Sequence, residues 1–149
     1  MKGLLVALTA GIAFWSCGGS GGSSSGLNPA FTGAWSGTTT ATIQGFAPYS
    51  YHSGINIAVS GSTGNIAQVC TDGSGSISFQ GSGSSAQWSG PATCPPVALF
   101  GICSAVTPTY QSGSLSLNTA NTLTAQGTGM ASGCGASRVP ATLTFVGSK

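Results

Sequence analysis

The sequence predicts an all-β protein in which about eight short antiparallel strands form a small up-and-down barrel. Apolar and polar residues alternate along several segments, for example at Ile55, Ile57 and Val59. The 25 Gly and 7 Pro residues interrupt these segments, and charged side chains make up only 3% of the 149 residues. Because Glu and Lys, which favour helices, are nearly absent, the alternation indicates strands. A β-sandwich is the alternative architecture.

The expected strands lie near residues 34–44, 53–60, 64–70, 75–80, 85–91, 104–117, 121–131 and 138–147. Turns are expected at residues 61–63, 72–74, 81–83 and 118–121, where Gly, Asp, Asn, Ser and Thr gather. The best candidate for a helix is short and covers residues 96–102. On the solvent side of the strands, Ser and Thr take the place of charged residues.

Residues 1–16 have the pattern of an export signal. Lys2 precedes an uncharged apolar run at residues 3–15, which is shorter than the ~20 residues that a membrane-spanning helix needs. Ser16 and Cys17 follow this run, and a Gly/Ser segment continues to residue 26. This order resembles that of bacterial lipoproteins. It is similar to the myxobacterial type with a relaxed cleavage motif, because Phe14 and Trp15 stand where Leu and a small residue are usual.

The resemblance implies that the signal is removed before Cys17 and that the Cys17 sulfur carries a lipid. Residues 17–26 are then a lipidated Cys with a flexible tether, and residues 27–149 are a single β domain. Gly18 stands where Asp retains such lipoproteins in the inner membrane, which implies the outer membrane, on its periplasmic face or at the cell surface. Secretion after an ordinary signal cleavage is the alternative.

The count of Cys residues agrees with lipidation, because the chain holds 5 of them, an odd number. If Cys17 carries the lipid, an even number remains, which permits disulfides in an oxidising compartment. Cys70–Cys94 and Cys103–Cys134 are each symmetric about a predicted turn, and we expect these pairings. A local Cys94–Cys103 bridge around the Pro-rich segment is the alternative.

The charge balance excludes several classes of function. With Lys+Arg 3 and Asp+Glu 1, the chain lacks both the basic surface that nucleic acids require and the paired carboxylates of many hydrolases. A Ser-His-Asp triad has one available composition, His52 and Asp72 with a Ser, and the Gly-x-Ser-x-Gly matches lie in the tether. The Cys residues lack the spacing of a metal site, so we expect no metal. We also expect no other cofactor and no enzymatic activity.

Gly33, Ala34 and Trp35 open the first strand of the domain. This Gly-x-Trp resembles the first strand of lipocalins and avidins. The lipocalin resemblance implies that Trp35 packs under an Arg near the end of the last strand. Arg138 instead stands at the start of that strand, which places it at the wrong end of the barrel to meet Trp35.

A second candidate for recognition is a predicted loop that contains Phe46, Tyr49, Tyr51 and His52. Loops on rigid scaffolds carry function, and Tyr-rich loops suit polar or sugar surfaces.

These observations predict a lipid-anchored cell-envelope protein with a non-catalytic binding or structural role. The lipid provides the contact with the membrane, and candidate partners are another envelope protein, a glycan or a small apolar ligand. The alternative is a lipocalin-like carrier of a small apolar ligand, which requires an apolar cavity of ~300 Å³ or more inside the barrel.

Overall fold

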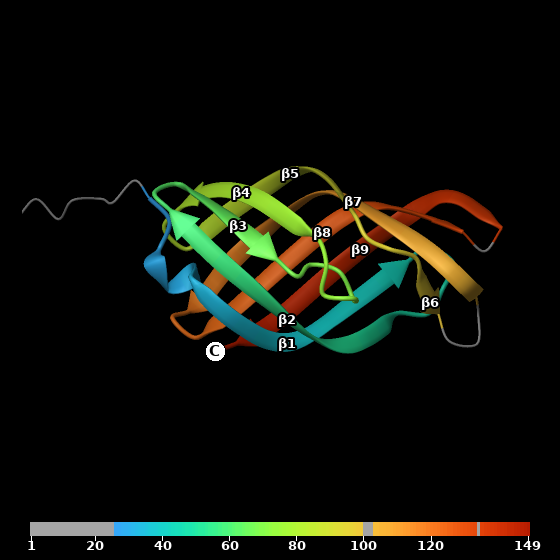
Figure 1. The fold of residues 1–149 in the computed structure, drawn as a ribbon, viewed down its shortest axis with the longest axis horizontal. Coiled ribbons are helices and arrows are strands. Elements are labelled where there is room, and N and C mark those ends of the chain that lie inside the picture. Colours follow the sequence, from blue (N-terminus) through green and yellow to red (C-terminus); the bar gives the residue numbers. More distant parts are fainter. Residues whose placement is uncertain (1–25, 100–102, 134) are drawn as a thin grey trace, which may run out of the picture.

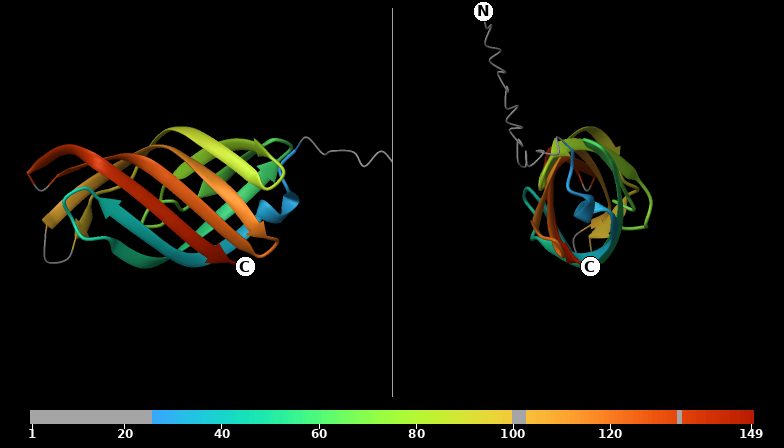
Figure 2. Two further views of the ribbon diagram at one scale, coloured as in Figure 1. Left: turned by 180° about the vertical axis from the view of Figure 1, so that it is seen from behind. Right: turned by 90° about the vertical axis from the view of Figure 1, so that its left-hand side faces the viewer.

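The computed structural model describes residues 26–99, 103–133 and 135–149, which form a closed antiparallel β-barrel (Figures 1 and 2). The ring consists of β1 (Gly33–Ile43), β2 (Tyr49–Ser60), β3 (Thr63–Ala67), β4 (Ser76–Ser82), β5 (Ser85–Thr93), β7 (Cys103–Thr119), β8 (Thr122–Gly133) and β9 (Ala136–Ser148). Neighbouring strands follow one another along the chain, and β9 returns to pair with β1. The predicted up-and-down barrel is therefore confirmed, and the β-sandwich alternative is wrong.

Two short elements accompany the ring. The 3-10 helix η1 (Pro29–Phe31) precedes β1, and Asn28 caps it by accepting a hydrogen bond of 2.9 Å from the Ala30 N–H. The strand β6 (Val97–Leu99) pairs with β7 beyond the part of β7 that β5 covers. In the described part of the chain no helix is long and apolar enough to cross a membrane.

The helix predicted at residues 96–102 is wrong where the structure describes it, because Val97–Leu99 is the strand β6. β5 does not pair with β7 near Val106, so the backbone hydrogen-bonding groups of β7 are available there to pair with Val97–Leu99. Pro95 and Pro96 also favour an extended chain at its start. Residues 100–102 lie outside the described residues.

The alternation of side chains places one face of each strand in the barrel interior. The side chains with the least exposure there include Phe31, Trp35, Leu115 and Leu123. They belong to a large apolar cluster near η1, whereas a smaller cluster of Ile43, Val106, Ala131 and Ala141 lies toward the other end. The interior is therefore packed along its length.

Two glycines make room for the indole ring of Trp88 inside the barrel. A Cβ atom at Gly113 on β7 would overlap this ring, and one at Gly127 on β8 would lie 3.1 Å from it. Because glycine has no Cβ, the ring packs directly against the backbone of both strands.

The described chain begins at the end of the barrel that η1 covers, and its C-terminus lies at the same end (Figures 1 and 2). The Leu27 N–H donates a hydrogen bond of 2.8 Å to the Gly61 carbonyl, and the Asn28 N–H donates one of 2.8 Å to the Gly83 carbonyl. These bonds attach the start of the domain to the β2–β3 and β4–β5 turns.

Candidate functional site

The end of the barrel near η1 is closed by a set of contacts around Trp35. Its indole N–H donates a hydrogen bond of 2.8 Å to the Phe31 carbonyl, and the Phe31 side chain is fully buried. The ammonium of Lys149 lies 4.5 Å from the centroid of the Trp35 ring. It also donates hydrogen bonds of 2.6 Å to the carbonyls of Ala30 and Thr32. We call this end the closed end.

Lys149 stands where the lipocalin resemblance implies an Arg. Arg138 lies at the start of β9, at the end of the barrel opposite to Trp35, as expected. The expectation considered Arg alone and missed Lys149, which directly follows β9. The sequence did contain this cation, because Lys149 follows the last strand and a Lys side chain, like that of Arg, can contact an aromatic ring.

The barrel interior leaves little space for a ligand. One pocket inside the barrel, lined by described residues, has a volume of about 30 Å³. Its lining comes from β1, β2, β7, β9 and the segment that follows β3, and it includes Ile43, Tyr49, Tyr51, Cys70, Tyr110 and Leu143. This volume holds about one water molecule and is far below the ~300 Å³ of a small-molecule site.

Two tyrosines beside this pocket have altered acidity. Burial is the main cause that raises the pKa of Tyr110, and the nearby Tyr51 raises it further. Burial also raises the pKa of Tyr51, although a hydrogen bond with Thr39 partly offsets this effect. The rings of Tyr49 and Tyr51 are stacked, with their centroids 5.6 Å apart.

The predicted recognition loop is wrong as a loop, because Tyr49, Tyr51 and His52 lie on β2. Phe46 remains in the turn before β2, where it packs against the smaller apolar cluster, as does Tyr49. His52 is exposed on the outer face, and its Nε2 lies 3.1 Å from the Ser36 Oγ. The four residues therefore do not form one surface.

His52 and Asp72, the residues available for a triad, are each bonded elsewhere. The Asp72 carboxylate accepts hydrogen bonds of 3.0 Å from the Ser74 N–H and 2.6 Å from its hydroxyl. These bonds hold the pKa of this carboxyl below its usual value. They close a turn between β3 and β4, which is the structural role expected of Asp-Gly. Among the described residues, no three His, Cys, Asp or Glu side chains are grouped to hold a metal ion.

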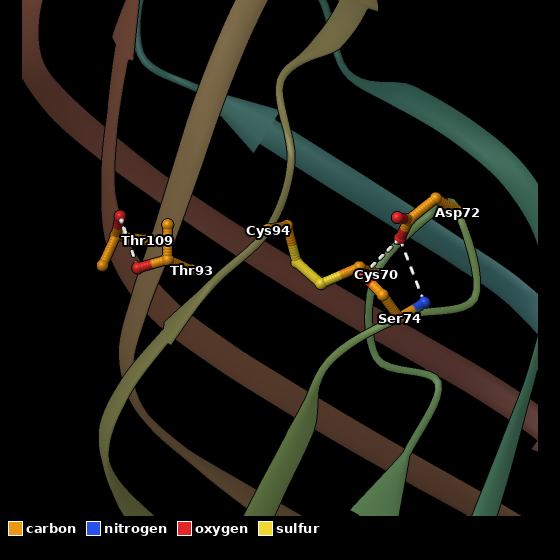
Figure 3. The surroundings of a disulfide bond; sticks show 6 residues. All are labelled: Cys70, Asp72, Ser74, Thr93, Cys94 and Thr109. Carbon is orange, nitrogen blue, oxygen red and sulfur yellow. Dashed lines mark hydrogen bonds between the residues drawn. A yellow bond between two sulfur atoms is a disulfide. The ribbon is translucent and has the colours of Figure 1, made fainter.

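The predicted Cys70–Cys94 disulfide is present, with the two Cα atoms 5.4 Å apart (Figure 3). Its position differs from the expected one, since the cysteines do not face each other across a hairpin. The β4–β5 ladder contains only the pairs from Gln80↔Gln87 to Ser82↔Ser85, and Cys70 lies in the turn before β4. The bridge therefore joins this turn to the end of β5 where the ladder is absent.

The alternative Cys94–Cys103 bridge is wrong, because Cys94 is bonded to Cys70. The remaining Cys predictions stay predictions. Cys103 begins β7, but Cys134 lies outside the described residues, so the Cys103–Cys134 pairing is open. The predicted signal at residues 1–16 and the predicted lipidation of Cys17 also fall on residues outside the described ones.

The outer wall of the barrel is hollowed over the end of β2 and over β3, β4 and β5. One hollow has a volume of about 680 Å³ and lies where β4 and β5 separate beyond the Gln80–Gln87 pair. A second hollow, of about 470 Å³, lies beside it and shares Gln80 and Gln87 in its lining. We call the two hollows together the outer groove, whose main polar lining residues are Ser60, Asn65, Ser78, Gln80, Gln87 and Ser89. Sequence reasoning missed this feature, because a local interruption of a ladder has no simple sequence signal.

A scan against protein-family models, a search of curated proteins and a search of solved structures found no match to this chain.

Proposed function

We propose that this protein is a lipid-anchored cell-envelope barrel with a non-catalytic binding role. The observation that carries the proposal is the packed interior, whose pocket of about 30 Å³ has no room for a small-molecule ligand. A packed barrel presents its outer wall, rather than its interior, to a partner. The described wall is hollowed over the end of β2 and over β3, β4 and β5, which supports a binding role over a purely structural one.

The anchor is proposed from the sequence order of apolar run, Ser16, Cys17 and Gly/Ser tether. The described domain begins at the closed end, so a lipid on Cys17 tethers the barrel by that end. The opposite end and the outer wall then remain accessible to partners at the outer membrane.

A Cys17→Ser variant tests the anchor in a Gram-negative host. The unchanged chain should fractionate with the outer membrane and require detergent for release. The Cys17→Ser chain should not become lipidated and should lose this detergent requirement. Ser20→Ala, a matched change within the tether, should fractionate like the unchanged protein. Equal membrane association of the Cys17→Ser chain would contradict the proposal.

A lipocalin-like carrier is the second candidate, because the Trp35–Lys149 contact matches what the Gly-x-Trp resemblance implies, with Lys in place of Arg. It requires the interior to open around a ligand. Titration with a long-chain fatty acid, followed through the NMR signals of Tyr51 and Tyr110, tests it. Saturable shifts of these interior residues would favour the carrier over the proposed function.

A further inference from the structure

We propose that the outer groove binds a segment of an uncharged polysaccharide. This inference rests on the binding role proposed above and names its ligand class, but it does not depend on the lipid anchor.

The shape of the groove suits a chain rather than a compact molecule. The two hollows share Gln80 and Gln87 in their linings, so they lie next to each other along β4 and β5, with this pair between them. Both hollows are open to solvent, which allows a polymer to enter and leave at either end. An enclosed site would accept only a chain terminus or a small molecule.

The lining of the groove is uncharged and combines hydrogen-bonding side chains with apolar ones, such as Val59 and Trp88. Among the described residues that line the groove, none has an ionisable side chain, and most have amides or hydroxyls. An amide side chain both donates and accepts hydrogen bonds, and so matches the hydroxyl groups of a sugar. Nothing in the lining compensates the charge of an anionic or cationic polymer, whose desolvation would be costly.

The amides of Gln80 and Gln87 are free to bind. They stand opposite each other across the β4–β5 ladder, both are exposed, and within the described chain neither side chain makes a hydrogen bond. Asn65, on the neighbouring strand, has only a long contact of 3.5 Å with the Ser76 hydroxyl.

Some other cross-strand polar pairs on the outer wall form hydrogen bonds with each other. The Thr40 and Ser50 hydroxyls lie 2.8 Å apart, and the Asn118 amide donates to the Thr124 hydroxyl at 2.9 Å. The side chains in these pairs bond to each other, whereas the amides of Gln80 and Gln87 remain available to a ligand. The groove therefore combines a concave shape with unpartnered amides.

NMR titration of the full mature chain tests the inference, in a detergent without a sugar headgroup. The probes are cellohexaose, laminarihexaose and isomaltohexaose, with hexagalacturonate as the anionic counterpart. We expect at least one neutral hexasaccharide to shift the side-chain amide signals of Gln80 and Gln87 saturably. The affinity should not change with salt, because no ion pair forms.

A Gln80→Ala/Gln87→Ala variant should bind about tenfold more weakly, since two hydrogen bonds of ordinary strength are lost. Gln126→Ala, which removes an exposed amide from β8 outside the groove, is the matched control and should bind normally. Unchanged thermal melting shows that both variants fold.

Three results would overturn the inference: no shift with any neutral probe, unchanged affinity in the double variant, or tighter binding of hexagalacturonate. If any of these results is obtained while Cys17 is lipidated, the glycan site is refuted and the anchor stands. If Cys17 is unmodified, only the anchor is refuted.

Discussion

The ammonium of Lys149 lies 4.5 Å from the centroid of the Trp35 ring and links the segment after β9 to the first strand of the barrel. The same ammonium donates hydrogen bonds of 2.6 Å to the Ala30 and Thr32 carbonyls, on either side of the last residue of η1. One cation therefore fastens the strand, the 3-10 helix and the C-terminal segment at the closed end.

Lys149→Met should lower the free energy of unfolding by about 1–2 kcal/mol, because a cation–π contact and two exposed hydrogen bonds are lost. Denaturant unfolding followed by circular dichroism measures the change. Lys149→Arg should retain most of the stability, since Arg reaches the same ring and carbonyls. Equal stability of the Lys149→Met and unchanged chains would show that the contact does not stabilise the fold.

The Cys70–Cys94 disulfide should contribute about 3 kcal/mol, because it restricts a loop with a sequence separation of 24 in the unfolded chain. Cys70→Ser/Cys94→Ser should therefore unfold at clearly lower denaturant concentration. The double variant avoids a free thiol, and the outer groove should remain, since its lining lies on strands. If the double variant unfolds at the same denaturant concentration as the unchanged chain, the disulfide does not stabilise the fold.

Stability should fall at alkaline pH because of Tyr110. Burial raises the pKa of its phenol above the ordinary value of 10.0, so the unfolded chain loses this proton before the folded chain does. The stabilising effect is complete below pH 10.0 and is lost as the pH rises through the folded-state pKa. Tyr110→Phe keeps the ring and should show a smaller alkaline loss in pH-dependent unfolding. If both chains lose the same stability at alkaline pH, ionisation of Tyr110 is not the cause.

Much of the barrel was predictable from local alternation. Positions such as Ile55 and Ile57 point inward on β2, and the strand bounds differ from the predicted ones by a few residues in most cases. Residues 49–52 of β2 are predicted as part of a loop, because aromatic residues gather there rather than alternating apolar ones. Pairing with β1, from Thr38↔His52 to Ala41↔Tyr49, makes this segment a strand.

Only part of the closed end was predictable from the local sequence. Asn28 followed by Pro29 is a start signal for a short helix and was overlooked. The partner of Trp35 is set by the closure of the ring, which brings the end of β9 beside β1. Likewise, the Cys70–Cys94 pairing was correct although the assumed hairpin geometry was wrong, because the β4–β5 ladder is too short to reach either cysteine.

The central claim, that a lipid anchors this barrel in the cell envelope, is tested most directly by mass spectrometry of the N-terminal peptide from the outer-membrane fraction. We expect a peptide that begins at Cys17 and carries a diacylglyceryl group on its sulfur. A mature chain with an unmodified N-terminus at another residue, which either lacks Cys17 or has it as a free thiol, would show that no lipid anchors the barrel.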